Sequence, residues 1–439
     1  QTWQTWQTWQ TWQTWQTQAS HVSEVTVEKA SNPFEPGAGT RPPNLVGRER
    51  EIEDALASIA RGKANRPIRG QIFYGIRGVG KTVLLRHIGR LATETGCVVA
   101  HLETPEGKSF PKLLVPELRK TVLELSLAAK AKAKLTRAVG ALQAFASIFE
   151  IKVGDVGVEV GTPKGLADSG DLEADLGDLL VSVGELASAA ERGVVIALDE
   201  MQYLAIDDLS AVVSAVHRCN QEGLPIGFFG AGLPNLLAKA GDAKSYSERL
   251  FQFVEVGPLS NEDAGRAIQM PIEAAGAKIA KNALAFIVKQ TRGYPYFLQE
   301  WGFGAWNAAS KSPISLSEVE AANNGIIDRL DRSFFKVRYD RLTVTEKLYL
   351  RAMAELGPGP HASGDVANML GRDVKALGSI RRRVIEKGMA YDTEYGVVAF
   401  TVPLFDDFMK REVPDFKPGS VPEARPGPAK RRRKSPSRS

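Results

Sequence analysis

One short stretch limits what this chain can fold into: residues 74–84, which read YGIRGVGKTVL. A glycine, four further residues and then Gly-Lys-Thr stand between a short apolar segment and a helical pattern. Glycines allow a loop to turn its backbone N–H groups toward phosphate oxygens, and the N-terminus of the following helix adds partial positive charge. The motif therefore predicts a nucleotide-phosphate site between a strand and a helix.

Each part of this motif has an expected role, with ATP and Mg²⁺ as the expected ligands. We expect Lys81 to reach the β- and γ-phosphates and the hydroxyl of Thr82 to bind Mg²⁺. The residues predicted to surround the phosphates are Gly75, Gly78, Val79, Gly80, Lys81, Thr82 and Val83. A glycine-rich turn with a purely structural role is the alternative.

A second motif, VVIALDE at residues 194–200, is an apolar strand that ends in two carboxylates. In P-loop proteins such a strand places an Asp beside Mg²⁺, so Asp199 is a predicted metal-site residue. Glu200 is placed to polarise an attacking water, which makes it a predicted catalytic residue together with Lys81. A hydrolase needs this adjacent Glu, whereas a kinase acting on a small substrate has no general need for it. The alternative is a pair of solvated residues at a strand end.

Short apolar strands alternate with helical patterns between residues 71 and 256, which predicts a parallel α/β sheet. From residue 260 onward the strand patterns stop and an all-α module follows. The expected strands are QIFYG, CVVAHLE, VVIALDE, LPIGFFGAG and FQFVEVGPL, and FEIKVGDVGVEVG at residues 149–161 predicts a hairpin.

The chain begins with five Gln-Thr-Trp triplets, a low-complexity segment that we interpret as an expanded nucleotide repeat, an upstream start or a fragment boundary rather than a functional element. The predicted divisions are a low-complexity and extended segment (1–44), a nucleotide-binding core (45–258), a helical lid (259–312), a helical connector (313–341), a winged-helix domain (342–412) and a disordered basic tail (413–439).

The formal net charge of +5 comes from the tail. From Lys417 onward, eight Lys/Arg and one Asp/Glu give +7, so the rest of the chain carries about −2 (5 − 7). A basic pI that arises in this way is weak support for nucleic-acid binding. No apolar run approaches the roughly 20 residues of a membrane helix, and the N-terminus does not have the pattern of a signal peptide. We therefore expect a cytoplasmic protein that does not bind a membrane.

Residues 345–403 follow the order helix, helix, helix, hairpin, which is typical of a winged helix. The helix at 373–387 is expected to bury Val374, Leu377, Ile380 and Val384. The residues expected to face duplex DNA are Lys375, Arg381, Arg382 and Arg383. Residues 341–412 carry eleven Lys/Arg against ten Asp/Glu, so an autoinhibitory or protein-docking role stays open. The basic tail predicts contact with phosphates or acidic surfaces.

Several motifs in this order resemble AAA-type ATPases near the origin-recognition and STAND groups: LVGREREI, GIRGVGKT, VVIALDEMQYL, FFGAGLPNL, RLFQFVEVGPLS and RGYPYFLQEWGFGAW. More closely, residues 33–412 resemble a bacterial ATP-binding protein with an origin-recognition-like AAA domain. The resemblance implies an α/β P-loop NTPase core of the AAA+ type, an all-α lid and a C-terminal winged-helix domain. Residues 75–82 would be Walker A and residues 199–200 Walker B.

The resemblance also implies two contacts with the nucleotide base. Val46, Gly47 and Arg48 would lie near the adenine, in the segment before the first helix. Gly293-Tyr294-Pro295 looks like the GxP motif of STAND proteins, in which Pro295 would pack on the base from the lid.

Arg249 stands at a helix end directly before the fifth predicted strand. It is a third catalytic candidate, as an arginine finger that would act on the γ-phosphate held by a neighbouring subunit. It also falls where the box VII arginines of AAA+ proteins fall. A surface salt bridge or a packing role is the alternative.

Two departures from the family pattern affect the expected chemistry. The AAA+ pattern has a polar sensor after the fourth strand, where this chain has Gly230-Ala231-Gly232, and Tyr296 stands at the candidate position of the lid arginine. Fewer groups then stabilise the charge of the transition state, so we expect slow hydrolysis. We also expect an ATP/ADP switch that repositions the winged helix. The alternatives are a DNA-binding ATPase of the replication-initiator or regulator type and a nucleotide-dependent scaffold. A protein partner or a homo-oligomer stays open.

Overall fold

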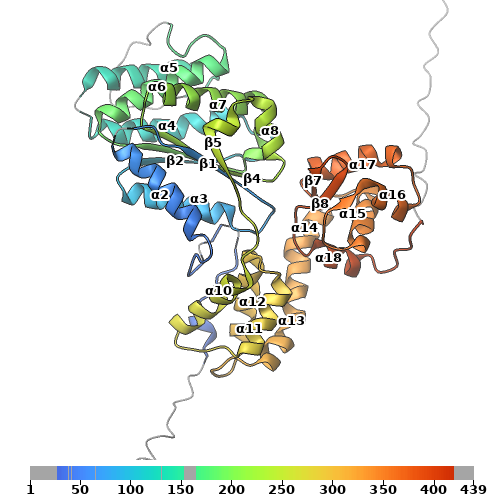
Figure 1. Cartoon of the computed structure of the whole chain (residues 1–439). Coiled ribbons are helices and arrows are strands. Elements are labelled where there is room, and N and C mark those ends of the chain that lie inside the picture. Colours follow the sequence, from blue (N-terminus) through green and yellow to red (C-terminus); the bar gives the residue numbers. More distant parts are fainter. Residues whose placement is uncertain are drawn as a thin grey trace, which may run out of the picture. The chain divides into compact units, whose positions relative to one another are not determined.

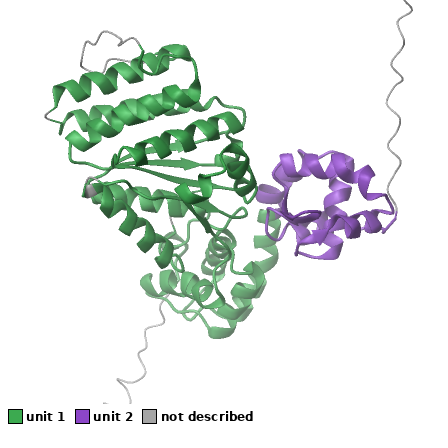
Figure 2. Ribbon diagram, turned by 45° about the horizontal axis from the view of Figure 1, so that its top comes forward, with its two compact units in different colours: residues 1–330 green, residues 331–439 purple. Residues whose placement is uncertain are grey.

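The computed structural model describes residues 27–37, 39–40, 42–64, 66–129, 131–152 and 165–419. The chain divides into two compact units, residues 1–330 and residues 331–439 (Figure 2). The Gln-Thr-Trp repeat, the KRRRK segment of the tail and most of the hairpin expected at 149–161 lie outside the described residues.

The first unit is built on a five-stranded parallel sheet with the strand order β2-β3-β4-β1-β5. Its strands are β1 (Gly70–Tyr74), β2 (Val98–Glu103), β3 (Val194–Asp199), β4 (Ile226–Gly232) and β5 (Phe251–Glu255). The expected parallel sheet is confirmed, with each strand at its predicted place. Because the strands are parallel, the loops that follow them meet at one edge of the sheet, which is where ligands bind in such folds. We call this edge the carboxyl edge.

Helices cover both faces of the sheet (Figure 1). Within β1, Ile72 belongs to the apolar core on one face and Phe73 to the core on the other, as the two-residue period of a strand requires. One face carries α2 (Glu49–Lys63) and α3 (Lys81–Glu94). The other carries α4 (Phe110–Ser126), α5 (Lys132–Ile148), α6 (Leu172–Ala189), α7 (Ile206–Gln221) and α8 (Leu236–Ala243), and the short α9 (Ser247–Leu250) leads into β5.

After β5 the first unit continues as helices only, as expected. These helices are α10 (Asn261–Ala274), α11 (Lys281–Thr291), α12 (Pro295–Ala308) and α13 (Leu316–Leu330). The side chains of Trp301 and Trp306, both on α12, are almost fully buried among them. Across the described part of the chain, every helix is too short or too polar to cross a membrane.

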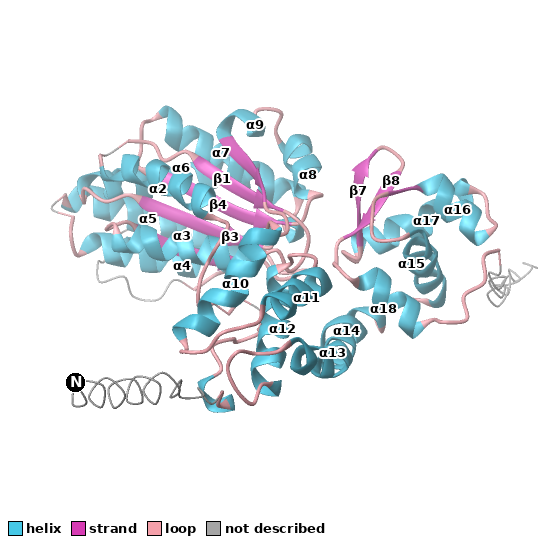
Figure 3. Ribbon diagram, turned by 60° about the horizontal axis from the view of Figure 1, so that its bottom comes forward, coloured by secondary structure: helices cyan, strands magenta, loops and turns pink. Residues whose placement is uncertain are grey.

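The second unit contains the helices and the hairpin expected for residues 345–403 (Figure 3). Its sheet has the antiparallel order β6-β8-β7. Its elements are η3 (Asp331–Phe335), α14 (Lys336–Tyr339), α15 (Val344–Leu356), β6 (His361–Ala362), α16 (Ser363–Leu370), α17 (Val374–Glu386), β7 (Ala390–Glu394), β8 (Val397–Phe400) and α18 (Phe405–Glu412).

One expected core position in this unit is wrong. Val374 is 45% exposed, whereas Leu377, Ile380 and Val384 are buried as predicted. Val374 is the first residue of α17, directly after its N-cap Asp373. The buried stripe of this helix therefore begins one turn later than its apolar pattern indicates.

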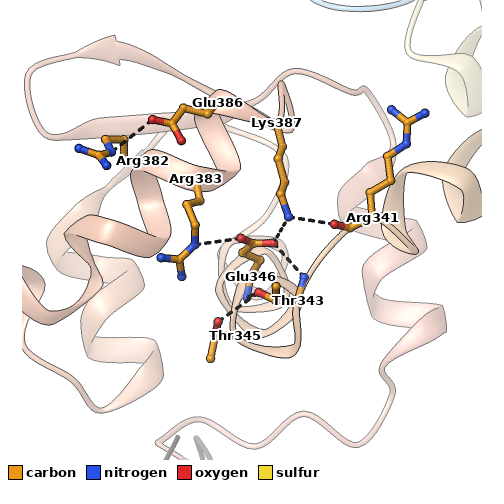
Figure 4. Close-up of polar contacts among 8 residues, drawn as sticks. All are labelled: Arg341, Thr343, Thr345, Glu346, Arg382, Arg383, Glu386 and Lys387. Carbon is orange, nitrogen blue, oxygen red and sulfur yellow. Dashed lines mark hydrogen bonds and ion pairs between the residues drawn. The ribbon is translucent and has the colours of Figure 1, made fainter. Parts of the chain in front are cut away.

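A buried carboxylate joins two helices of the second unit (Figure 4). Glu346, in the first turn of α15, is fully buried and forms a capping box with Thr343. Its Oε2 accepts hydrogen bonds from the Thr343 amide (2.9 Å) and from Nζ of Lys387 (2.7 Å), and its Oε1 accepts one from Nε of Arg383 (3.0 Å). Arg383 on α17 and Lys387 directly after it thus both bind a carboxylate of α15.

These partners decide the charge state of the carboxylate. Burial alone would raise the pKa of Glu346, but hydrogen bonds from Lys387, the Thr343 amide and Arg383 outweigh it and hold the pKa below its usual value. A carboxylate with a lowered pKa in the folded state stabilises the fold above its unfolded pKa, and this stabilisation is lost as the pH falls through the folded pKa.

We predict that Glu346→Gln lowers the free energy of unfolding of the second unit by about 2 kcal/mol at pH 7, because hydrogen bonds to a charged acceptor are lost. The difference from the wild type should shrink below about pH 4, where Glu346 itself takes up a proton. Urea unfolding at both pH values, with the transition of this unit assigned by hydrogen exchange in α15, measures it.

The matched control is Glu386→Gln. Glu386 pairs with Arg382 at 3.2 Å on the surface, with both side chains mostly exposed, so its loss should cost less than about 0.5 kcal/mol. Equal effects of the two substitutions would show that Glu346 does not join the helices.

Candidate nucleotide-binding site

The glycine-rich loop lies at the carboxyl edge, between the end of β1 at Tyr74 and the start of α3 at Lys81. Gly80 is the N-cap of α3 and has a φ of 93°, a conformation that favours glycine. A Cβ on Gly75 would stand 2.2 Å from the carbonyl oxygen of Val256, so the backbone can pass there only as glycine. Among the described residues, no atom beyond the chain neighbours of Gly80 comes within 4 Å of a Cβ built on it, so there is open space beside the first turn of α3.

Lys81 folds back over this loop. Its Nζ donates hydrogen bonds to the carbonyl oxygens of Gly75 and Ile76, both at 2.9 Å. Burial lowers the pKa of Lys81 to about 8, while the negative charges of Glu200 and Asp199 oppose this shift. The ammonium group is thus held next to the loop and the two carboxylates at the end of β3.

The two predicted metal-site residues meet although they lie 117 positions apart in the sequence (199 − 82). The hydroxyl of Thr82 donates a hydrogen bond to the carboxylate of Asp199. Asp199 is 7% exposed, and burial raises its pKa, while the bond from Thr82 and one from the amide of Glu200 (2.8 Å) oppose this shift. An oxygen pair of this kind at a phosphate loop fits the oxygen-only coordination that Mg²⁺ prefers.

Glu200 follows Asp199 in a left-handed conformation with a φ of 55°. Such a conformation is unusual for a residue with a side chain, and it persists only where the surroundings hold it. The charge of Glu200 acts on Lys81 more strongly than that of Asp199 does. The structure therefore brings all four residues, Lys81, Thr82, Asp199 and Glu200, to one place.

The segment before α2 also reaches the loop, through Arg48. Arg48 is 8% exposed, and its guanidinium donates hydrogen bonds to the carbonyl oxygens of Val79 (3.3 Å) and Gly257. A Cβ on its neighbour Gly47 would stand 3.0 Å from the side chain of Asp263 on α10. Val46, which precedes them, is buried. The side chain of Arg48 thus joins the loop backbone to the chain between β5 and the lid.

The lid contacts the loop through the first turn of α12. The amide of Tyr296 donates a hydrogen bond to the carbonyl oxygen of Gly78 at 3.2 Å. Pro295, the first residue of α12, is half-buried immediately before this contact. The predicted base-binding proline and the predicted phosphate loop are therefore neighbours in space.

Arg249 lies far from this site. It stands two residues before β5, whose first residue pairs with Gly70 at the start of β1. Five strand residues at about 3.3 Å each separate that end of β1 from the loop, roughly 15 Å away. Arg249 instead lines a cavity of ≈ 1030 Å³ together with Arg61 and Arg69. This position excludes an action on phosphates held by the same chain. The predicted action on a neighbouring subunit stays a prediction, with a surface salt bridge or a packing role as the alternative.

The four basic residues predicted to face DNA do not share one environment. Lys375 is exposed, and Arg382 is exposed beside Glu386. Arg381 is half-buried and paired with Asp392 of the hairpin, and Arg383 is turned toward Glu346. The side chain of Arg383 is 43% exposed, and its Nε donates a hydrogen bond to the buried carboxylate of Glu346, a contact that the helical pattern did not predict.

Gln202, two residues after Glu200, belongs to the site but was not among its predicted residues. Its side-chain amide donates a hydrogen bond to Oε2 of Glu200 and accepts one from the amide of Leu233, at the end of β4 (3.0 Å). A polar residue that follows the two carboxylates so closely was the only available signal. The hydrogen bond from Arg77 in the loop to the hydroxyl of Tyr203 (3.2 Å) was not predicted either.

Comparisons with known proteins agree with this geometry. Residues 44–228 match the model of the AAA ATPase domain, and residues 332–409 match a domain of unknown function. No curated protein matches the sequence.

Three solved structures illustrate the likeness. The Walker-type ATPase PABY2304 of Pyrococcus abyssi is 16% identical, with a TM-score of 0.55 over 86% of this chain and 99% of that chain. The Aeropyrum pernix ORC1 protein in complex with DNA is 16% identical, with a TM-score of 0.42 over 84% of this chain and 94% of that chain. The Thermotoga maritima RuvB Holliday junction branch migration motor is 15% identical, with a TM-score of 0.42 over 82% of this chain and 96% of that chain.

At identities of 15% and 16% the likeness concerns the fold alone. We base the conclusion about the fold on the first of the three structures, which has a TM-score of 0.55. The predicted core fold is thereby confirmed as that of a P-loop NTPase of the AAA+ type. The match to the AAA ATPase domain model is confined to residues 44–228.

Proposed function

We propose that the chain binds ATP with Mg²⁺ at the carboxyl edge of the sheet, hydrolyses it slowly, and uses the difference between ATP and ADP as a switch. The convergence of Lys81, Thr82, Asp199 and Glu200 on one glycine-rich loop is the observation that carries this proposal. Loop amides and the lysine would hold the phosphates, as the N-terminus of α3 favours anions. Thr82 and Asp199 would hold Mg²⁺, which neutralises charge on the phosphate oxygens when bound.

The chemical step follows from the position of Glu200. Its carboxylate accepts a proton from water while the water oxygen attacks the γ-phosphorus, and the bond to the bridging oxygen of ADP breaks. Lys81, drawn from the carbonyl oxygens of Gly75 and Ile76 toward the phosphates, offsets the negative charge that gathers there. Slow turnover is expected because glycines stand at the end of β4, and because Tyr296 stands at the candidate position of the lid arginine.

The switch rests on the contacts between the loop and the lid. The backbone of the loop is bound at Gly78 by the amide of Tyr296, and at Val79 by the side chain of Arg48. A ligand that rearranges the loop must therefore act on the first turn of α12. A nucleotide shifts an equilibrium only by its different contacts with the two states, and the γ-phosphate is the difference between ATP and ADP.

Duplex DNA is the second candidate partner, favoured by Lys375 and Arg382, which stand exposed on α17. Because phosphate contacts release counterions, binding should weaken steeply with salt. Fluorescence anisotropy of a labelled duplex tests it with the full chain and with residues 1–419. Binding by the full chain alone would assign the effect to the tail, and no binding by either at low salt would remove DNA from the account.

We predict that Glu200→Gln retains ATP binding and lowers the rate of hydrolysis by about 100-fold, since general-base catalysis is lost. Lys81→Ala should lose both binding and turnover. Phosphate release and equilibrium binding of a fluorescent ATP analogue measure the two effects. Glu222→Gln, at the surface beside Arg218, is the control and should match the wild type. Turnover by Glu200→Gln within twofold of the wild type would favour the scaffold alternative.

A second prediction concerns the helices that follow the lid. If the lid responds to the γ-phosphate, a non-hydrolysable ATP analogue and ADP should give different rates of tryptic cleavage between residues 313 and 345. Lys81→Ala should abolish that difference. Identical cleavage with both nucleotides bound at saturation would contradict the switch while leaving the ATPase intact.

A further inference from the structure

We propose that Gln202 is the positioning residue for Glu200. From the turn after β3 it supplies the polar side chain that residues 230–232, at the end of β4, lack. Gln202 lies in η2 (Met201–Tyr203) and is 8% exposed. The inference rests on the proposed hydrolysis of ATP, because it concerns the carboxylate that would activate the water.

The orientation of the Gln202 amide follows from its two partners. The backbone N–H of Leu233 can only donate, so the atom that faces it at 3.0 Å is the oxygen Oε1. The NH₂ group is then directed at Oε2 of Glu200, a carboxylate oxygen that accepts the hydrogen bond. Each partner requires the same orientation, so the amide is fixed at both ends.

The glycine at the end of β4 makes room for this amide. A Cβ on Gly232 would stand 3.1 Å from Oε1 of Gln202 and 2.7 Å from Cδ2 of Leu236. A polar side chain carried by β4 at this position would displace Gln202. The glycine that interrupts the expected sensor pattern is thus what a glutamine arriving from η2 requires.

The turn that carries Gln202 is itself tied down. Lys239 on α8 donates hydrogen bonds from Nζ to the carbonyl oxygens of Gln202 (2.9 Å) and Leu204. These tethers hold the backbone, whereas the amide of Gln202 holds the carboxylate. The left-handed backbone of Glu200 needs such support, because it is costly for a residue with a side chain.

The contact leaves Glu200 ready to act. Among the described residues, its Oε1 has no hydrogen-bond partner, and its charge acts on the ammonium group of Lys81. One carboxylate oxygen is therefore held by Gln202, and the other is available to a water near the phosphates.

The test measures kcat and KM for ATP in the full-length protein with Gln202→Glu and Gln202→Met. The first keeps the acceptor for Leu233 but loses the donor to Glu200, and the second loses both. We expect kcat to fall about tenfold in each, as for a general base held in the wrong place, with KM changed less than threefold. In a Glu200→Gln background, either substitution should lower kcat by less than twofold, because Gln202 acts through Glu200.

Gln269→Met is the matched control, since it removes the same kind of amide-to-carboxylate hydrogen bond on the exposed surface of α10, where Gln269 donates to Glu273 (2.6 Å). It should keep at least half of the wild-type kcat. The proposal is overturned if the Gln202 variants keep the wild-type kcat, if they lose as much in the Glu200→Gln background, or if Gln269→Met loses as much as they do. Absence of turnover in the wild type would instead overturn the proposed hydrolysis, and this inference with it.

Discussion

The site depends on one constraint, the burial of a lysine ammonium group inside a loop of glycines. Nζ of Lys81 is bound by two backbone carbonyl oxygens, and burial lowers its pKa to about 8. A buried cation needs negative charge nearby, and the end of β3 supplies it through Asp199 and Glu200. The parallel sheet makes this possible, because it brings the end of β3 and the loop after β1 to the same edge.

The same loop also binds the lid, through the first turn of α12. Its carbonyl oxygens bind Lys81 at Gly75 and Ile76, the α12 amide at Gly78 and the Arg48 guanidinium at Val79. Four peptide groups, which are close together in the sequence, thus connect Lys81, the lid and the segment before α2. In the proposed function, phosphates that compete for Lys81 would act on a backbone that the lid already binds.

Local patterns predicted the strands and the two carboxylates, because apolar runs and glycine spacing depend on near neighbours in the sequence. They did not predict the contacts of Gln202 with Leu233 or of Arg48 with Val79, since each joins residues about 30 positions apart. Arg383 shows the same limit: the helical period of α17 places it outward, but a buried Glu346 on another helix attracts it. In each case a buried polar group decided the outcome, and its partner could be seen only in the fold.

The central claim is that nucleotide phosphates take Lys81 away from the loop carbonyl oxygens. With a pKa of about 8, roughly half of the Lys81 side chains are uncharged at pH 8, and phosphates would raise this pKa. Calorimetric titration with ATP and Mg²⁺ in two buffers of different ionisation enthalpy measures the protons taken up. The account predicts uptake of about half a proton per ATP at pH 8 and almost none at pH 6.5. Binding without this pH-dependent uptake would contradict it.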